Sequence, residues 1–370
     1  MRIDIITLHR VRNYGSSLQT LALQNKLVEK GCDVEIIDYY PERYTSLGLL
    51  KRLKYKSKRL EKNPVVLLAA RMIISVSYIR KKIIFDRFLK RNLKTTSKIY
   101  RSEEELIANC PQADVYCTGS DQVWNSHWNE GIDYPFYLTF IPEGKMKFSY
   151  ASSFGNGSID KAEVETVKKF FKSYKYLSVR ENTGVDIFNS LGFEDVCQVL
   201  DPTLLMTEKD WKPYVSDRYK TMKYVVTYNL HHDLKIDRFA NELARAKGIK
   251  VFNISYNLHD IYRKGQLKWC PTVEEYLGLV KYAQYVVTDS FHATVFSLVF
   301  GKKFIAIYPE LASSRISSLL ELVGLEERGI IDYENVGIID ADIDYRKVNE
   351  TMSVERDKAL IYLDRVLAAC

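Results

Sequence analysis

The fold is decided by one stretch of the sequence, Tyr285-Val-Val-Thr-Asp-Ser-Phe-His-Ala-Thr-Val-Phe-Ser-Leu-Val-Phe-Gly-Lys-Lys-Phe-Ile-Ala-Ile307. Its pattern predicts a strand over 285–288, a buried helix that ends at Gly301, and a second strand over 304–307. The polar turn between the first strand and the helix contains Asp289, Ser290 and His292. In open parallel sheets ligands bind at this edge, where free N–H groups and the helix dipole favour an anion.

Strands and helices alternate on both sides of this stretch, in two series that meet near residue 205. Such alternation predicts parallel sheets. A chain of 370 residues also exceeds the size at which a single hydrophobic core usually stops growing. We therefore predict an α/β fold of two Rossmann-like domains that face each other across a cleft. The first spans residues 1–205, and the second spans 206–370, with a terminal helix that packs back across the first.

A basic helical insertion interrupts the first domain at about residues 45–105. From Lys51 to Arg101 there are 17 Lys and Arg and two acidic residues, a local charge of +15; since the whole chain carries +7, the remainder carries −8. The insertion includes an apolar run, Pro64–Tyr78, which only Arg71 interrupts. Basic flanks beside a short apolar helix are typical of a segment that lies on an anionic membrane. The alternative is a solvated basic hairpin whose apolar side is core.

Several classes of protein are not expected from this composition. The six cysteines form no CxxC or CxxH pair, which argues against a disulfide framework and a structural zinc site. Asp4 interrupts the first apolar run, so that run predicts a strand rather than a signal peptide. The basic insertion interleaves aliphatic rather than stacking aromatic residues, so nucleic acid is not an expected partner. We expect a cytoplasmic protein without a metal or cofactor, and a peripheral contact to the inner face of the cell membrane is one of the two alternatives for its basic insertion.

Polar turns also follow the strands of the first domain. Asn13, Gly15 and Ser16 occupy a turn at a helix start, which either receives a phosphate or sugar hydroxyl on its N–H groups or is a simple N-cap. The turn lacks GxGxxG spacing, so a dinucleotide is not indicated.

Two later edges of the first domain add aromatic, amide and charged groups. Asp121, Trp124 and Asn125 follow one strand, and an aromatic face with amide and carboxylate groups suits a sugar ring. Ser153 and Arg180 end two further strands, and an arginine there suits a carboxylate or phosphate.

Together these turns resemble the polysaccharide pyruvyl transferase family, over nearly the whole chain. The motifs that carry the resemblance are Asn13-Tyr-Gly-Ser-Ser-Leu-Gln19, Gly119-Ser-Asp-Gln-Val-Trp-Asn125, Ser149-Tyr-Ala-Ser-Ser-Phe-Gly155, Ser178-Val-Arg-Glu181, Asp201-Pro-Thr203 and Thr288-Asp-Ser-Phe-His292. The resemblance implies a GT-B-like fold. It also implies transfer of pyruvate from phosphoenolpyruvate onto two sugar hydroxyls as a cyclic ketal, in the synthesis of bacterial exopolysaccharides or capsules.

The resemblance also implies residue roles. His292 matches the family's histidine, and an imidazolium is a suitable acid for protonating the methylene carbon of phosphoenolpyruvate. Arg180 matches the anion-binding arginine. Ser290 stands where some members have an arginine, so Arg315, Lys302 or Lys303 would supply the missing charge. The donor-binding candidates are Ser290, Arg315, Asn13, Gly15 and Ser16. The acceptor-binding candidates are Asp121, Trp124, Asn125 and Ser153.

Two other functions fit the same outline, because a fold does not fix a function. One is a glycosyltransferase that uses a nucleotide sugar, for which Pro309-Glu310 is a poor candidate grip. The other is a non-catalytic glycan-binding assembly protein, which needs Trp124 but not His292. The acceptor is a free glycan, a nucleotide sugar or a polyprenyl-linked sugar. The histidines expected to be surface or core residues are His9, His127, His231, His232 and His259.

Overall fold

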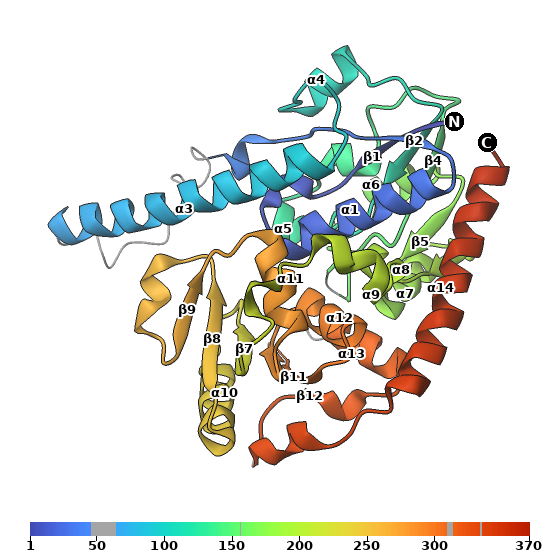
Figure 1. The fold of residues 1–370 in the computed structure, drawn as a ribbon. Helices are drawn as coiled ribbons and strands as arrows, with labels where there is room; N and C mark the ends of the chain where they lie inside the picture. Colours follow the sequence, from blue (N-terminus) through green and yellow to red (C-terminus); the bar gives the residue numbers. More distant parts are fainter. Residues whose placement is uncertain (46–63, 156, 309–313, 334) are drawn as a thin grey trace. The chain divides into compact units, whose positions relative to one another are not determined.

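The computed structural model describes residues 1–45, 64–155, 157–308, 314–333 and 335–370, and among these the side chains of 64–71 and 314 are excepted (Figure 1). The chain divides into two compact units. The first unit contains Met1–Glu42, Leu89–Met206 and Asn349–Cys370, and the second contains Arg43–Phe88 and Thr207–Val348. No helix in the described ranges is long and apolar enough to cross a membrane.

The first unit is built on a four-stranded sheet in the order β2-β1-β3-β4, and every neighbouring pair is parallel. A short parallel pair, β5-β6, continues this surface through isolated bridges from Phe148 to Tyr176 and from Ser152 to Val179. The strands are β1 (Arg2–Ile6), β2 (Asp33–Ile36), β3 (Val115–Thr118), β4 (Met146–Ser149), β5 (Leu177–Val179) and β6 (Val196–Gln198).

Helices follow these strands as a parallel sheet requires. The helices of this unit are α1 (Tyr14–Glu29), α4 (Glu103–Ala108), α5 (Ser126–Asn129), α6 (Val164–Phe171), α7 (Asn182–Ser190) and α8 (Pro202–Leu205). The final helix α14 (Tyr345–Ala368) begins in the second unit, and from Asn349 onward it belongs to the first. There the hydroxyl of Tyr362 donates to the carbonyl of Ser149 at 2.7 Å, so α14 is fixed to the end of β4.

The second unit is built on a six-stranded parallel sheet in the order β12-β11-β10-β7-β8-β9. Its strands are β7 (Tyr224–Tyr228), β8 (Lys250–Ser255), β9 (Gln266–Trp269), β10 (Tyr285–Thr288), β11 (Lys303–Ile307) and β12 (Gly329–Ile330). Its helices are α9 (Glu208–Trp211), α10 (Leu234–Lys247), α11 (Val273–Lys281), α12 (Phe291–Val299) and α13 (Ser314–Leu322). The strand, helix and strand predicted for 285–307 are thus confirmed, as is the α/β class with parallel sheets.

Helix α10 shows why this unit folds as it does. The side chain of Asp233 caps its first turn by accepting from the N–H of Lys235 at 2.8 Å, and Gly248 ends it in the left-handed conformation at φ 64°. Ile236, Phe239 and Leu243 share one face and are fully buried against the sheet. The apolar residues recur with the helical period of 3.6, and their burial joins this helix to the sheet.

The basic insertion contains the long helix α3 (Pro64–Asn92). It interrupts the sequence of the first unit, but residues 43–88 group with the second unit rather than with the first, where the sequence analysis placed the insertion. Residues 46–63, which include the start of the basic run at Lys51, lie outside the described residues.

Candidate active site

The strongest candidate in the second unit is the turn from β10 into α12. Ser290 is the N-cap of α12, and its side chain accepts from the N–H of Ala293 at 3.4 Å. His292 lies in the first turn of this helix and is 7% exposed, with its ring edge-on to Phe291 at 5.1 Å. The dipole of α12 makes this terminus favourable for an anion. The predicted strand-to-helix position of His292 is therefore confirmed, whereas its role as the acid stays a prediction.

Asp289 organises this turn and connects it to the neighbouring strand. Its buried carboxylate accepts from the N–H of Leu230 at 2.7 Å, from the N–H of His231 at 2.8 Å, and from Nδ1 of His231 at 2.8 Å. Leu230 and His231 follow β7, which pairs with β10 in parallel. The contact thus exists because two adjacent parallel strands end at the same edge of the sheet.

His231 is one functional candidate that sequence reasoning missed. Its side chain is 52% exposed, and the hydrogen bond to Asp289 raises its pKa above the usual value, although burial opposes the rise. Arg315 lies close enough to lower the pKa of His231 through its charge. His231, the carboxylate of Asp289 that it contacts, Arg315 and the N-terminus of α12 therefore lie at one edge of the second unit. Sequence reasoning missed His231 because a single sequence does not reveal that β7 and β10 are adjacent in the sheet.

The first unit has an acidic cluster at the corresponding edge of its own sheet. Nη1 of Arg180 contacts Asp201 at 2.9 Å, Nε contacts Glu181 at 3.5 Å, and Nη2 contacts Asp121 at 3.9 Å. The side chain of Arg180 is only 2% exposed. Such an environment already supplies the guanidinium with carboxylates and would repel an added anion. The donor-binding role assigned to Arg180 from the sequence stays a prediction, and this geometry favours a role in orienting the acids.

Hydrogen bonds hold the members of this acidic cluster in place. Oγ of Ser16 donates to Oδ2 of Asp121 at 2.5 Å, and Oγ of Ser153 donates to Oε1 of Glu181. Asp121 has φ 78°, a left-handed conformation that Asp and Asn adopt more readily than other residues with a Cβ. The structure therefore brings together Ser16, Asp121, Ser153 and Arg180 and adds Glu181, which the list of candidates lacked.

Asn13 and Gly15 lie at the start of α1, as the sequence predicted. The side chain of Asn13 caps α1 by accepting from the N–H of Gly15 at 2.8 Å, which is the N-cap alternative. Gly15 lies within the first turn of α1, and the left-handed residue before this helix is Arg12, at φ 56°. Asn13 and Gly15 therefore have a structural role that explains their presence.

Trp124 is buried in the core of the first unit. It is 2% exposed, its Nε1 donates to the carbonyl of Phe136 at 3.1 Å, and its ring packs edge-on against Phe171 at 4.8 Å. In this position it presents no open face on which a sugar could stack. Asn125 caps α5 by accepting from the N–H of Trp128 at 3.1 Å and donates to Gln122 at 2.8 Å.

Gly155 explains how two of the motifs come together. It has φ 73°, and a Cβ there would lie 2.2 Å from Oε1 of Gln122 and 2.3 Å from Nδ2 of Asn125. Only a glycine allows the turn after β4 to approach the turn after β3 this closely.

Two other expectations concern a metal and a nucleotide. Within the ranges that the structure describes, no three His, Cys, Asp or Glu residues are grouped to hold a metal ion. Pro309-Glu310, the poor candidate for a nucleotide grip, lies outside the described residues.

The two units with their parallel sheets define an α/β protein with two Rossmann-like domains, of the GT-B-like class. Solved structures show the same fold at low sequence identity. A UDP-N-acetylglucosamine 2-epimerase from Rickettsia bellii is similar with a TM-score of 0.55 and 10% identity, over 98% of this chain and 95% of that one. The UDP-GlcNAc 2-epimerase of Methanocaldococcus jannaschii, in complex with UDP-GlcNAc and UDP, is similar with a TM-score of 0.53 and 13% identity, over 100% of both chains.

The family follows from the sequence itself. The family model for polysaccharide pyruvyl transferase matches residues 13–310. The chain therefore belongs to the polysaccharide pyruvyl transferase family, as its motifs predicted. No curated protein sequence matches it.

Proposed function

We propose that this transferase moves the enolpyruvyl group of phosphoenolpyruvate onto two hydroxyls of one sugar and forms a cyclic pyruvate ketal. The observation that supports it best is the edge of the second unit where His292, His231 and Arg315 accompany the N-terminus of α12. Phosphoenolpyruvate is a small anion with a carboxylate and a phosphate, and converging cations and N–H groups are what such a ligand requires.

His292 is the proposed general acid. It gives a proton to the methylene carbon of the donor, which becomes a methyl group, and the neighbouring carbon takes on oxocarbenium character. A first sugar hydroxyl attacks that carbon and loses its proton, and phosphate leaves with the C–O bonding pair. A second hydroxyl then attacks, loses its proton, and closes the ketal ring.

The donor anion would be held by Arg315 and stabilised by the helix dipole at the start of α12. The serine in place of an arginine makes this edge less positive, and the raised pKa of His231 offsets part of that loss because the imidazole stays protonated to higher pH. His231 is thus a proposed donor-binding residue.

The first unit would bind the acceptor through its acidic cluster. Asp121 and Glu181 are carboxylates that accept hydrogen bonds from sugar hydroxyls, and Ser16 and Ser153 fix their orientation. We propose that Arg180 keeps the two acids in place through its contacts with both of them. The acceptor belongs to the synthesis of a bacterial surface polysaccharide.

The decisive measurement is release of phosphate from phosphoenolpyruvate in the presence of glycan or lipid-linked sugar acceptors, with mass spectrometry of the product. A pyruvylated sugar that forms together with phosphate is expected. Release of a nucleotide from a nucleotide sugar would instead show a glycosyltransferase. Glycan binding without turnover of any donor would show an assembly protein.

A further inference from the structure

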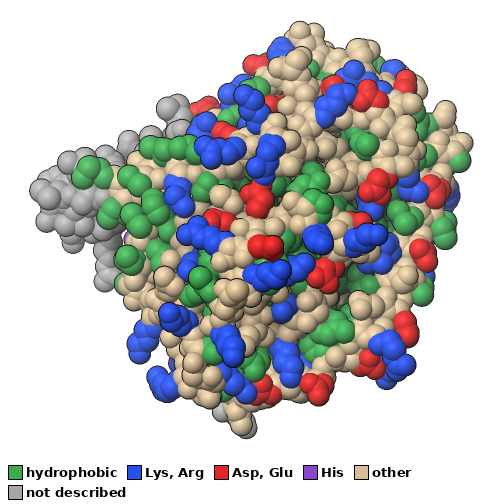
Figure 2. Space-filling view, viewed as in Figure 1, with side chains coloured by type: hydrophobic (Ala, Val, Ile, Leu, Met, Phe, Trp, Pro, Cys, Tyr) green, Lys and Arg blue, Asp and Glu red, His purple; other side chains and the backbone are tan. Residues whose placement is uncertain are grey.

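The outer face of α3 exposes a stripe of aliphatic side chains. Met72, Val76, Ile79 and Ile83 are 57, 47, 54 and 52% exposed. Their spacing of four, three and four residues places them on one side of the helix. On the face of the molecule that Figure 2 shows, hydrophobic side chains lie along the described part of α3, with basic side chains beside them. A surface helix of a globular protein normally turns polar groups outward, so the stripe requires a partner.

The opposite side of the same helix is already used within the second unit. Oγ of Ser77 accepts from the N–H of Leu258 at 3.0 Å, and the ring of Phe85 lies 6.0 Å from that of Tyr256. Nζ of Lys81 lies 4.1 Å from the centre of the Tyr256 ring. The helix therefore already has one face packed against the second unit, and the exposed stripe is a second, separate apolar face.

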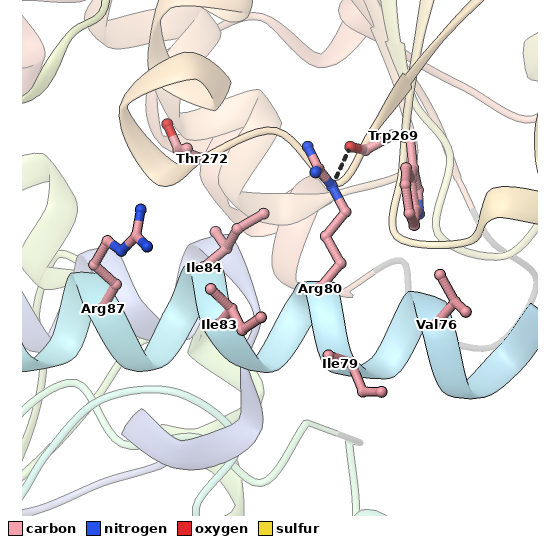
Figure 3. Close-up of a pocket in the computed structure, with 8 residues that line it drawn as sticks. All are labelled: Val76, Ile79, Arg80, Ile83, Ile84, Arg87, Trp269 and Thr272. Atoms are coloured by element: carbon pink, nitrogen blue, oxygen red, sulfur yellow. Dashed lines mark hydrogen bonds between the residues drawn. The ribbon is translucent and has the colours of Figure 1, made fainter.

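A groove extends the apolar surface beyond the helix. It has a volume of about 440 Å³, and aliphatic residues of α3 line it together with Trp269 and Thr272 (Figure 3). Nε of Arg80 donates to the carbonyl of Trp269 at 3.1 Å, and its guanidinium lies over the indole ring at 4.6 Å. These contacts hold Arg80 at the border of the groove, and Arg87 lies seven residues, about two turns, further along the same side of the helix.

Cations border the stripe on both sides. Residues 72–88 contain four basic residues, Arg80, Lys81, Lys82 and Arg87, and one acid, Asp86. Arg80, Lys82 and Arg87 are exposed. An aliphatic stripe with long basic side chains beside it fits the boundary between lipid headgroups and acyl chains, because the charged ends reach the phosphates while the stems cover apolar surface.

We infer that this face of α3, with the groove beside it, docks the protein on an anionic membrane surface. Charge complementarity selects this partner, because the insertion is strongly basic whereas the rest of the chain is acidic. The inference does not depend on which donor or acceptor the enzyme uses.

The full-length protein is tested by sedimentation with phosphatidylcholine vesicles and with vesicles that also contain phosphatidylglycerol. Binding is expected on the anionic vesicles only. It should weaken steeply with salt, because the Debye length falls from about 10 Å at 0.1 M to about 3 Å at 1 M. Arg87→Gln should lower the partition coefficient about five-fold, the equivalent of one basic residue near the surface.

The apolar contribution is tested by the double variant Ile79→Gln/Ile83→Gln, which should lower the partition coefficient at least about ten-fold. The matched control is Val354→Gln/Ile361→Gln, which changes two exposed aliphatic residues of another helix, α14, and should bind as the parent does. Thermal unfolding is measured for both, and Ile79→Ala/Ile83→Ala replaces the double variant if glutamine impairs folding.

Three outcomes would overturn the inference. They are equal binding to neutral and anionic vesicles, binding to neither, and undiminished binding of both stripe variants. If the parent is instead a dimer that the stripe variants dissociate, and no vesicle binding occurs, the stripe is a contact between two copies of the chain.

Discussion

The carboxyl edges of the two sheets hold different sets of charged groups although they are built on the same plan. In the first unit Arg180 is enclosed by Asp121, Glu181 and Asp201. In the second unit the one buried acid of the turn, Asp289, is satisfied by two N–H groups and by His231. The comparison teaches that strand ends only gather polar groups, and that the residues placed there decide which ligand each edge can bind.

The largest effect is expected at the edge of the second unit. His292→Gln should lower kcat about 10²- to 10⁴-fold, the usual contribution of a general acid, with little change in stability. Phosphate release from phosphoenolpyruvate measures it, and His127→Gln, which changes an exposed histidine of the first unit, is the control. Activity within a few-fold of the parent would remove His292 from the mechanism.

The next effect concerns the acidic edge. Arg180→Met should destabilise the protein by about 3 to 5 kcal/mol, because it leaves buried carboxylates without their cation. Arg218→Met is the control, since Arg218 pairs with Glu275 while 67% exposed and such pairs contribute about 1 kcal/mol or less. Thermal unfolding compares the two. If Arg180 instead binds the donor, as the sequence analysis predicted, the substitution should raise the Kd for phosphoenolpyruvate at least about ten-fold. Weaker donor binding with unchanged stability would therefore support the donor-binding role.

A third prediction tests how the two turns of the first unit are joined. Gly155→Ala should destabilise the protein by about 2 to 4 kcal/mol, because left-handed strain is added to a clash with Gln122 and Asn125. Gly144→Ala has a similar φ, 82°, but its Cβ would meet nothing within 4 Å. It should therefore cost only the strain, about 1 to 2 kcal/mol. Urea unfolding measures the free energy of unfolding of both variants. Equal destabilisation by the two substitutions would mean that Gln122 and Asn125 move aside at no cost.

The smallest effect is a pH dependence at His231. Because Asp289 raises the pKa of His231 in the folded state, this pair stabilises the protein fully below the unfolded pKa of about 6.5 and ceases to do so as pH rises through the folded pKa. The contribution should be under about 1 kcal/mol, since the side chain is half exposed and screened by water. The stability difference between the parent and His231→Gln should shrink with rising pH, and NMR titration of the imidazole should show the raised pKa. An unshifted titration in the parent would contradict the proposed coupling to Asp289.

Much of the fold could be predicted because its signals are local. The β-branched run at 285–288, the apolar helix and Gly301 determine a strand, helix and strand wherever the segment lies. The motifs also identified the family, since their order along the chain is itself a property of the sequence.

The burial of individual residues could not be predicted in the same way. A tryptophan at position 124 is compatible both with stacking on a sugar and with packing against Phe171. Only the packing of α5 and α6 decides which of the two its ring contacts. In the same way Arg180 is an arginine at a strand end in either role, and the positions of Asp121 and Asp201, 59 and 21 residues away, decide which groups surround it.

The sequence by itself determined the parallel α/β class, the family and the histidine at the turn before α12, because each depends on neighbours along the chain. Only the tertiary structure decided that β7 lies beside β10 and so joins His231 to Asp289, that three carboxylates enclose Arg180, and that α3 exposes an aliphatic stripe while burying its other side. The physical reason is that charge, hydrogen bonding and burial act through space, so they depend on which strands pair and which helix face finds a partner.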